Sequence, residues 1–117
     1  MKYSEMVQIF NKNGIDIEKV GYTYGLKLTG CGPCEGYIVN QKTGKYAHMV
    51  IGDRDNGRID REYDSEDAAV ADMICEIRRS AIYRKAKYHK NHDTSEINSK
   101  ILDVATRLYT QTSVNNG

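Results

Sequence analysis

The sequence predicts an α+β domain in which an N-terminal helix, a four-stranded antiparallel meander sheet and two C-terminal helices follow one another. Apolar residues recur at helical spacing near both ends of the chain. The middle is rich in Gly, Tyr, Val and Thr, and its apolar residues alternate with neighbours that would face the other side. Short turns join the expected strands, so neighbouring strands should pair antiparallel. Helices packed on one face would then bury the sheet.

The first helix is expected between a cap at Ser4 and a stop at Asn13-Gly14. Glu5 follows the cap, and the helix dipole stabilises a carboxylate in the first turn. The helical spacing rests on Tyr3, Met6, Val7 and Phe10.

The four strands are expected at residues 22–28, 36–41, 46–51 and 58–63. In the first of them, large apolar or aromatic residues occupy every second position: Tyr22, Tyr24, Leu26 and Leu28. A hairpin-type turn at 42–45 and a second turn at Asp55-Asn56-Gly57 separate the later strands. In the last strand, Ile59 and Arg61 should face one side, and Asp60 and Glu62 the other.

Two helices are expected after the sheet. Ser65 should cap the first, which begins with the acids Glu66 and Asp67 and runs to about Lys87. Ser95 should cap the second, after a polar break at 89–94. Apolar stripes at helical spacing support both helices: Val70, Ile74, Ile77 and Ala81 in the first, and Ile97, Ile101, Val104 and Leu108 in the second. Residues 1–110 should form a single domain, and 111–117 a flexible tail.

The composition is that of one globular domain. The chain has 117 residues, of which 39% are hydrophobic and 28% charged. A domain of this length buries roughly two-thirds of its unfolded surface, enough for one core. The first ten residues contain Glu5 where a signal peptide needs an apolar run, and no stretch is apolar enough to span a membrane. The three cysteines are then expected to be reduced thiols in the cytoplasm.

The segment Cys31-Gly32-Pro33-Cys34 has the letters of the thioredoxin redox motif but not its context. That chemistry needs a helix after the motif, because the helix N-terminus lowers the pKa of the first thiol. Here Glu35 and a Gly-Tyr-Ile-Val strand pattern follow. We therefore expect a turn between strands, with an ordinary thiol pKa and no disulfide-reductase activity.

Neither a metal nor a cofactor is expected. Cys31 and Cys34 have zinc-like spacing, but Cys75 and the histidines at 48, 89 and 92 do not form a regular second pair. The acidic segment that starts at Asp53 resembles a calcium loop, yet its glycine is fifth instead of sixth and its twelfth position is Asp64. A turn with solvated acids is the preferred interpretation.

Charge is unevenly placed along a chain of net charge +1. Residues 53–72 contain eight acids and three bases, a net charge of −5, whereas residues 78–90 contain six bases and no acid. Either segment could steer a charged partner. The aromatic residues are nine Tyr, one Phe and no Trp, and several of the tyrosines fall on the expected sheet. Tyrosine suits interfaces because it combines a large contact area with a polar tip.

The sequence predicts a binding protein and not an enzyme. It contains no Gly-rich phosphate loop, no Ser-His-Asp context and no pair of carboxylates in an apolar setting. The layout of residues 1–90 resembles the small immunity proteins of bacterial polymorphic-toxin and contact-dependent inhibition systems. The similar features are the opening helix, the strands around Gly36-Tyr37-Ile38-Val39 and Gly44-Lys45-Tyr46, the Asp55-Asn56-Gly57 turn and the helix start Ser65-Glu66-Asp67-Ala68-Ala69. The resemblance implies a cytoplasmic protein that binds a cognate toxin and blocks its active site.

Two binding surfaces follow from these patterns. The first would dock on a basic partner such as a nuclease toxin through Asp53, Asp55, Asp60, Glu62, Asp64, Glu66, Asp67, Tyr37 and Tyr46. The alternative is a nucleic-acid surface made by Arg78, Arg79, Arg84, Lys85 and Lys87, with Tyr83 or Tyr88 for stacking. A solvated basic helix face is the plainer interpretation of that second set.

Overall fold

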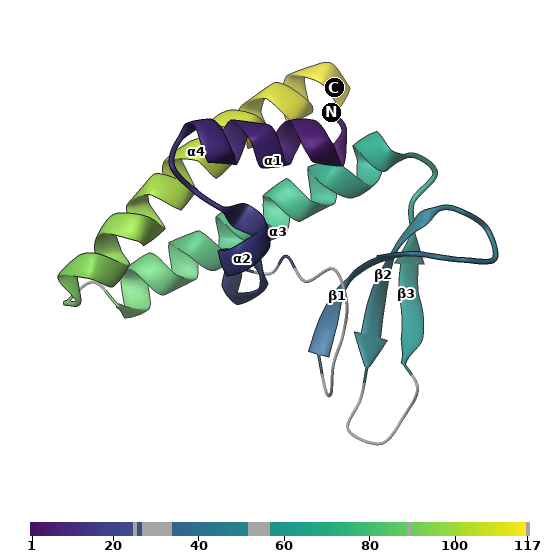
Figure 1. Cartoon of the computed structure of the whole chain (residues 1–117), viewed down its shortest axis with the longest axis horizontal. Coiled ribbons are helices and arrows are strands. Elements are labelled where there is room, and N and C mark those ends of the chain that lie inside the picture. Colours follow the sequence, from purple (N-terminus) through teal and green to yellow (C-terminus); the bar gives the residue numbers. More distant parts are fainter. Residues whose placement is uncertain (25, 27–33, 52–56, 89, 117) are drawn as a thin grey trace.

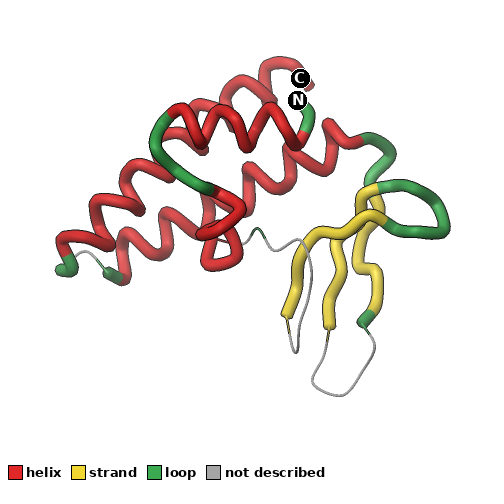
Figure 2. Tube along the Cα trace, in the orientation of Figure 1, coloured by secondary structure: helices red, strands yellow, loops and turns green. Residues whose placement is uncertain are grey.

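Five helices and three strands make up the fold in the computed structural model, which describes residues 1–24, 26, 34–51, 57–88 and 90–116 (Figures 1 and 2). In chain order the elements are α1 (Tyr3–Lys12), α2 (Ile17–Val20), the 3-10 helix η1 (Gly21–Tyr24), β1 (Cys34–Val39), β2 (Tyr46–Ile51), β3 (Arg58–Glu62), α3 (Glu66–Lys87) and α4 (His92–Asn116). The α+β class and the two C-terminal helices are confirmed. In the described part of the chain, no helix is both long and apolar enough to cross a membrane.

The described residues form a three-stranded antiparallel sheet in the order β1-β2-β3, so the prediction of four strands is wrong. The strand expected at 22–28 begins inside η1, and residues 25, 27 and 28 lie outside the described part. Leu26 N–H donates to the Gly21 carbonyl at 2.8 Å, which folds this segment back on itself. Tyr24 and Leu26 are both buried. Tyr24 and Leu26 therefore alternate because both are buried in a turn. A period-two pattern of apolar residues does not distinguish such a turn from a strand.

β3 contains a bulge at Asp60. His48 of β2 pairs with Arg61, whereas the next residue, Met49, pairs with Ile59, so Asp60 is the extra residue. The bulge changes the expected alternation, because the Asp60 carboxylate reaches His48 on the face that Arg61 also occupies. The prediction that Asp60 and Arg61 face opposite sides of the sheet is therefore wrong.

The helix ends follow side-chain hydrogen bonds. α1 begins at Tyr3, one residue before the expected cap at Ser4, because Glu66 accepts the Tyr3 N–H at 2.7 Å and Glu5 accepts the Lys2 N–H at 3.1 Å. The predicted cap of α3 is confirmed, since Ser65 Oγ accepts the Ala68 N–H at 3.1 Å.

α4 begins at His92 and not after Ser95, because Asn91 Oδ1 accepts the Thr94 N–H at 3.1 Å and so caps the helix earlier. The helix also continues through 111–116, where the sequence predicted a flexible tail. Thr112 is buried, and its hydroxyl donates to the Tyr109 carbonyl. These local bonds satisfy polar side chains that would otherwise disfavour a helix.

The core lies mainly among helices. Buried residues of α1, α3 and α4 form it together with Ile15, Ile17, Tyr24 and Leu26. Of the described strand residues, Tyr37 alone belongs to this cluster. α3 lies between the sheet and α4 in Figure 1, and it contacts both. The sheet therefore joins the rest of the protein chiefly through α3.

A buried hydrogen bond joins η1 to α4. Tyr24 Oη donates to Asn98 Oδ1 at 2.6 Å, and Asn98 is fully buried. Tyr24→Phe should lower the free energy of unfolding by about 1–3 kcal/mol, because the Asn98 oxygen would lose its donor without gaining water. Urea denaturation measures the change. Tyr109→Phe, at a more exposed tyrosine, should change stability by less than about 0.5 kcal/mol. An equal effect of the two substitutions would contradict the role given to Asn98.

Candidate functional site

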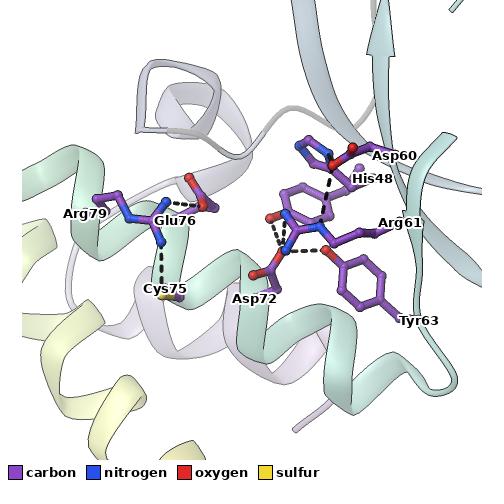
Figure 3. Close-up of polar contacts among 9 residues, drawn as sticks. His48, Asp60, Arg61, Tyr63, Asp72, Cys75, Glu76 and Arg79 are labelled. Carbon is purple, nitrogen blue, oxygen red and sulfur yellow. Dashed lines mark hydrogen bonds and ion pairs between the residues drawn. The ribbon is translucent and has the colours of Figure 1, made fainter. Parts of the chain in front are cut away.

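A polar cluster lies where the sheet meets α3 (Figure 3). We call it the Asp72 cluster. Its members come from the three described strands, from the residue that follows β3 and from the second turn of α3, and they are Tyr37, His48, Asp60, Arg61, Tyr63 and Asp72. Tyr37 and His48 are paired across β1 and β2, and His48 and Arg61 across β2 and β3. Residues paired in this way share one face of a sheet, which brings all three toward α3.

Asp72 accepts hydrogen bonds from two tyrosines. Tyr37 Oη donates to Asp72 Oδ2 at 2.9 Å, and Tyr63 Oη donates to the same oxygen. Arg61 Nη2 lies 3.4 Å from it. Tyr37 is fully buried, and the Tyr37 and Tyr63 rings lie 6.2 Å apart. The Asp72 carboxylate is thus held by a phenol from β1, a guanidinium from β3 and the phenol of the residue that follows β3.

The bulge links this arrangement to His48. Asp60 Oδ2 lies 3.3 Å from His48 Nδ1 and 3.6 Å from Arg61 Nε. The His48 ring meets the Tyr37 ring edge-on, with centroids 5.2 Å apart. Arg61 therefore bridges the two carboxylates of Asp60 and Asp72, as Figure 3 shows.

Both tyrosines of the cluster are held in the protonated form. Burial raises the pKa of Tyr37 above its ordinary value, and the negative charge of Asp72 raises it further. Burial also raises the pKa of Tyr63, as does its hydrogen bond to Asp72. Protonated phenols donate to the carboxylate and are poor bases at neutral pH. The groups of the cluster therefore bind one another and connect the sheet to α3.

The sequence did not predict this cluster. It placed Tyr37 on a partner-binding surface, whereas the structure buries Tyr37 fully between the sheet and α3. The one available signal was Asp72 itself, an acid directly before the buried pair Met73 and Ile74 in a helix. A carboxylate beside a buried stripe needs donors from a neighbouring element.

Further along α3, Arg79 contacts two side chains of its own helix (Figure 3). Arg79 Nη1 donates to Glu76 Oε1 at 2.7 Å, and Nη2 lies 3.8 Å from Cys75 Sγ. Cys75 is half-buried. The described residues hold no group of three or more His, Cys, Asp or Glu side chains arranged to bind a metal ion.

The Cys31–Cys34 segment leads into a strand, as predicted, because β1 begins at Cys34. Residues 31–33, His89 and the side chains of Cys34 and His92 lie outside the described part of the chain. The expectation of an ordinary Cys31 thiol therefore stays a prediction.

The structure gathers five of the predicted acids where β3 ends and α3 begins. We call this group the acidic corner, formed by Asp60, Glu62, Asp64, Glu66 and Asp67. Asp53 and Asp55 lie outside the described residues.

Four of the five carboxylates have close internal partners. Asp60 contacts His48 and Arg61, as described above. Glu62 accepts hydrogen bonds from Asn40 and Thr43 at 2.8 and 3.0 Å. Glu66 binds the Tyr3 N–H, and Asp67 lies 3.0 Å from the N-terminal ammonium group, whose hydrogen bond lowers the pKa of Asp67.

Asp64 is the exception. Its side chain is fully exposed, and its nearest cation is Lys45 Nζ at 3.7 Å. Asp64 also lines a shallow hollow in the acidic corner, together with Gly44, Lys45, Tyr46, Tyr63, Ser65 and Glu66. Tyr46 is half-buried there, and burial followed by the nearby Glu66 charge raises its pKa. Three predicted partner-binding residues, Tyr46, Asp64 and Glu66, thus meet in one concavity.

The predicted basic residues lie on the second half of α3, far from this corner. A 22-residue helix is about 33 Å long, so opposite charges gather toward its two ends. Arg78 stacks on Tyr109 at 5.0 Å, and Arg84 lies over Tyr24 and Tyr88 at 5.2 and 5.0 Å.

Lys87 lies over both Tyr83 and Tyr88, at 5.6 and 5.4 Å, and Lys85 is exposed. Tyr88 therefore contacts two cations and is half-buried, whereas Tyr83 is 62% exposed. Of the two tyrosines expected to stack on bases, Tyr83 is the accessible one.

Comparison with known proteins finds no matching family model, no similar curated protein and no similar solved structure. The resemblance to immunity proteins stays a prediction, and function is argued from the surfaces above.

Proposed function

We propose that this chain is a non-catalytic binding protein that neutralises a basic protein partner, as the resemblance to toxin-immunity proteins implies. The observation that carries this proposal is the hollow in the acidic corner, where Tyr46, Tyr63, Asp64 and Glu66 meet. Two aromatic rings beside two carboxylates suit an arginine or lysine side chain of a partner. Such a side chain gains cation–π contact and charge-assisted hydrogen bonds in one place.

The hollow is built on well-anchored side chains. Tyr63 donates its hydroxyl to Asp72, and its backbone N–H donates to the Tyr46 carbonyl at 2.9 Å. Glu66 is bound to the Tyr3 N–H. Little side-chain freedom is then lost on binding, which favours affinity.

Asp64 is the carboxylate most available to a partner. Its contact with Lys45 is a single exposed ion pair, and such pairs contribute about 0–1 kcal/mol. A partner's guanidinium can replace Lys45 at small cost. Asp60, Glu62 and Asp67 have internal partners and lie outside the hollow. The proposed binding site is therefore the hollow and not the whole acidic segment.

The Asp72 cluster supports a role without catalysis. Its carboxylate, phenol and guanidinium groups bind one another, and the phenols stay protonated at neutral pH. A general base or nucleophile needs a group whose pKa is tuned toward the working pH, and the tyrosine shifts run the other way.

The test is binding to the protein encoded beside this chain in its genome, measured by titration calorimetry. Asp64→Lys should weaken binding by at least about tenfold, because it places a cation where the partner's cation docks. Asp103→Lys on α4 is the matched control, since Asp103 is exposed like Asp64 and likewise has a basic partner, Arg107 in place of Lys45. That variant should bind as the unaltered protein does. The hollow is not the interface if both variants bind with unchanged affinity.

A further inference from the structure

A second charged surface runs along the outward side of α3. We call it the α3 ridge, and it comprises Arg79, Ser80, Tyr83, Arg84 and Lys87. Arg79, Tyr83 and Lys87 follow one another at intervals of four residues, and Ser80 and Arg84 form a second such row beside them. The buried residues Ile74, Ile77 and Ala81 lie on the other side of the helix from Arg79, Tyr83 and Lys87, and the half-buried Arg84 lies at the border between the two sides. Arg79, Ser80, Tyr83 and Arg84 together line a shallow hollow.

The positive charge of the ridge is largely uncompensated. Arg79 has a carboxylate partner in Glu76. Among the described residues, Arg84 and Lys87 have none, and they lie over tyrosine rings instead. The buried Arg84 Nε also has no hydrogen-bond acceptor in that part of the chain. The acidic corner differs, because most of its carboxylates have internal partners.

Tyr83 gives the ridge an exposed aromatic ring. It is 62% exposed and follows Ile82, which is 43% exposed. Its one ring contact among the described residues is Lys87, whose ammonium lies 5.6 Å from the centroid. An exposed aromatic ring flanked by cations offers a face on which a planar, negatively charged ligand can stack.

We propose that the α3 ridge binds single-stranded nucleic acid, with phosphates at Arg79, Arg84 and Lys87 and one base stacked on Tyr83. Three cations supply the phosphate contacts, and an exposed tyrosine supplies the stacking platform that unpaired bases use. A duplex fits less well, because its base faces are stacked on one another and unavailable to Tyr83. The inference does not depend on the proposed function, which concerns the opposite end of α3.

The test is fluorescence anisotropy with a labelled oligothymidine of about 12 nucleotides, a length within the site sizes of single-strand binders. Binding should weaken with salt at a slope of about −2 in log–log form, since each contact contributes about −0.7. Tyr83→Ala should weaken binding about tenfold through lost stacking. Lys87→Glu should weaken it at least as much and make the salt dependence shallower.

Arg107→Glu on α4 is the control for the charge reversal at Lys87, because Arg107 is also an exposed cation and lies outside the α3 ridge, where it pairs with Asp103 of its own helix. Its affinity should stay within about twofold of the unaltered protein. Thermal unfolding of each variant confirms that the fold is kept. The proposal is overturned if oligothymidine does not bind at low salt, or if Tyr83→Ala has no effect. Equal affinity for a duplex, or equal competition by polyglutamate, would also overturn it, because either would define a general anion surface.

Discussion

Replacing Asp72 by alanine is expected to lower the free energy of unfolding by about 3 kcal/mol. The substitution removes the shared acceptor of Tyr37 and Tyr63 and the partner of Arg61. Tyr37 is fully buried, so its hydroxyl would be left without an acceptor inside the protein. Urea denaturation followed by circular dichroism measures the loss.

Two further variants make the test of Asp72 specific. Asp72→Asn keeps an acceptor oxygen but loses the charge, so its cost should be smaller than that of alanine. Asp103→Ala removes an exposed acid that is paired within α4, and it should cost less than about 0.5 kcal/mol. A loss below about 1 kcal/mol for Asp72→Ala would show that the cluster does not hold the sheet to α3.

Alkaline pH should unfold the protein through the same cluster. Burial raises the pKa of Tyr37 and Tyr63 in the folded state above the unfolded value of about 10. A group whose pKa is higher in the folded state than in the unfolded state contributes to stability, and this contribution is fully present at any pH below the pKa of the unfolded state. That stability is lost as pH rises through and beyond about 10, because the unfolded state ionises first. Tyr3, whose pKa burial also raises, adds to the effect.

The measurement is denaturant stability as a function of pH, with tyrosinate absorbance followed in parallel. These tyrosines should leave the free energy of unfolding nearly constant from pH 7 to 9, and above that range it should fall steeply. Tyr63→Phe removes one titrating phenol, so its stability should fall less steeply above pH 10. Tyrosinate absorbance that reaches its full unfolded-state amplitude near pH 10 without loss of structure would contradict the buried, protonated state assigned to Tyr37 and Tyr63.

The helices were the more predictable part of this fold. A Ser cap, two acids and an i, i+4, i+7 stripe defined α3 from Ser65 to Lys87, and the structure has these bounds. The early start of α4 was harder to predict, since both Asn91 and Ser95 are good caps and the choice between them depends on the surrounding contacts. α4 continues through Asn116, beyond the domain end expected at residue 110, and Thr112 lies on its buried side.

The sheet was predicted less well, and for a physical reason. Alternation at Tyr24 and Leu26 indicates burial of every second residue, and a turn that packs on helices gives the same pattern. The Asp60 bulge has no local sequence signature, because it depends on how β3 pairs with β2.

The same limit applies to the candidate site. Tyr46, Asp64 and Glu66 were predicted as a group because all belong to a tyrosine-rich, acidic region, and the structure brings them into one hollow. Tyr37 was expected at the surface and is buried, because the sequence does not tell which face of the sheet α3 covers. The Asp72 cluster joins residues from four elements, and such distant partners are not visible in spacing along one chain.

The position of α3 between two layers also bears on how the protein can evolve. Its inward residues contact the sheet, α1 and α4, so substitutions there disturb several elements together. Arg79, Tyr83 and Lys87 have their described side-chain contacts within α3 and the residue that follows it. Surface changes at such positions usually alter stability by no more than about 0.5 kcal/mol. Natural variation can therefore change the ligand preference of the α3 ridge freely while selection keeps the inward side, and with it the fold, constant.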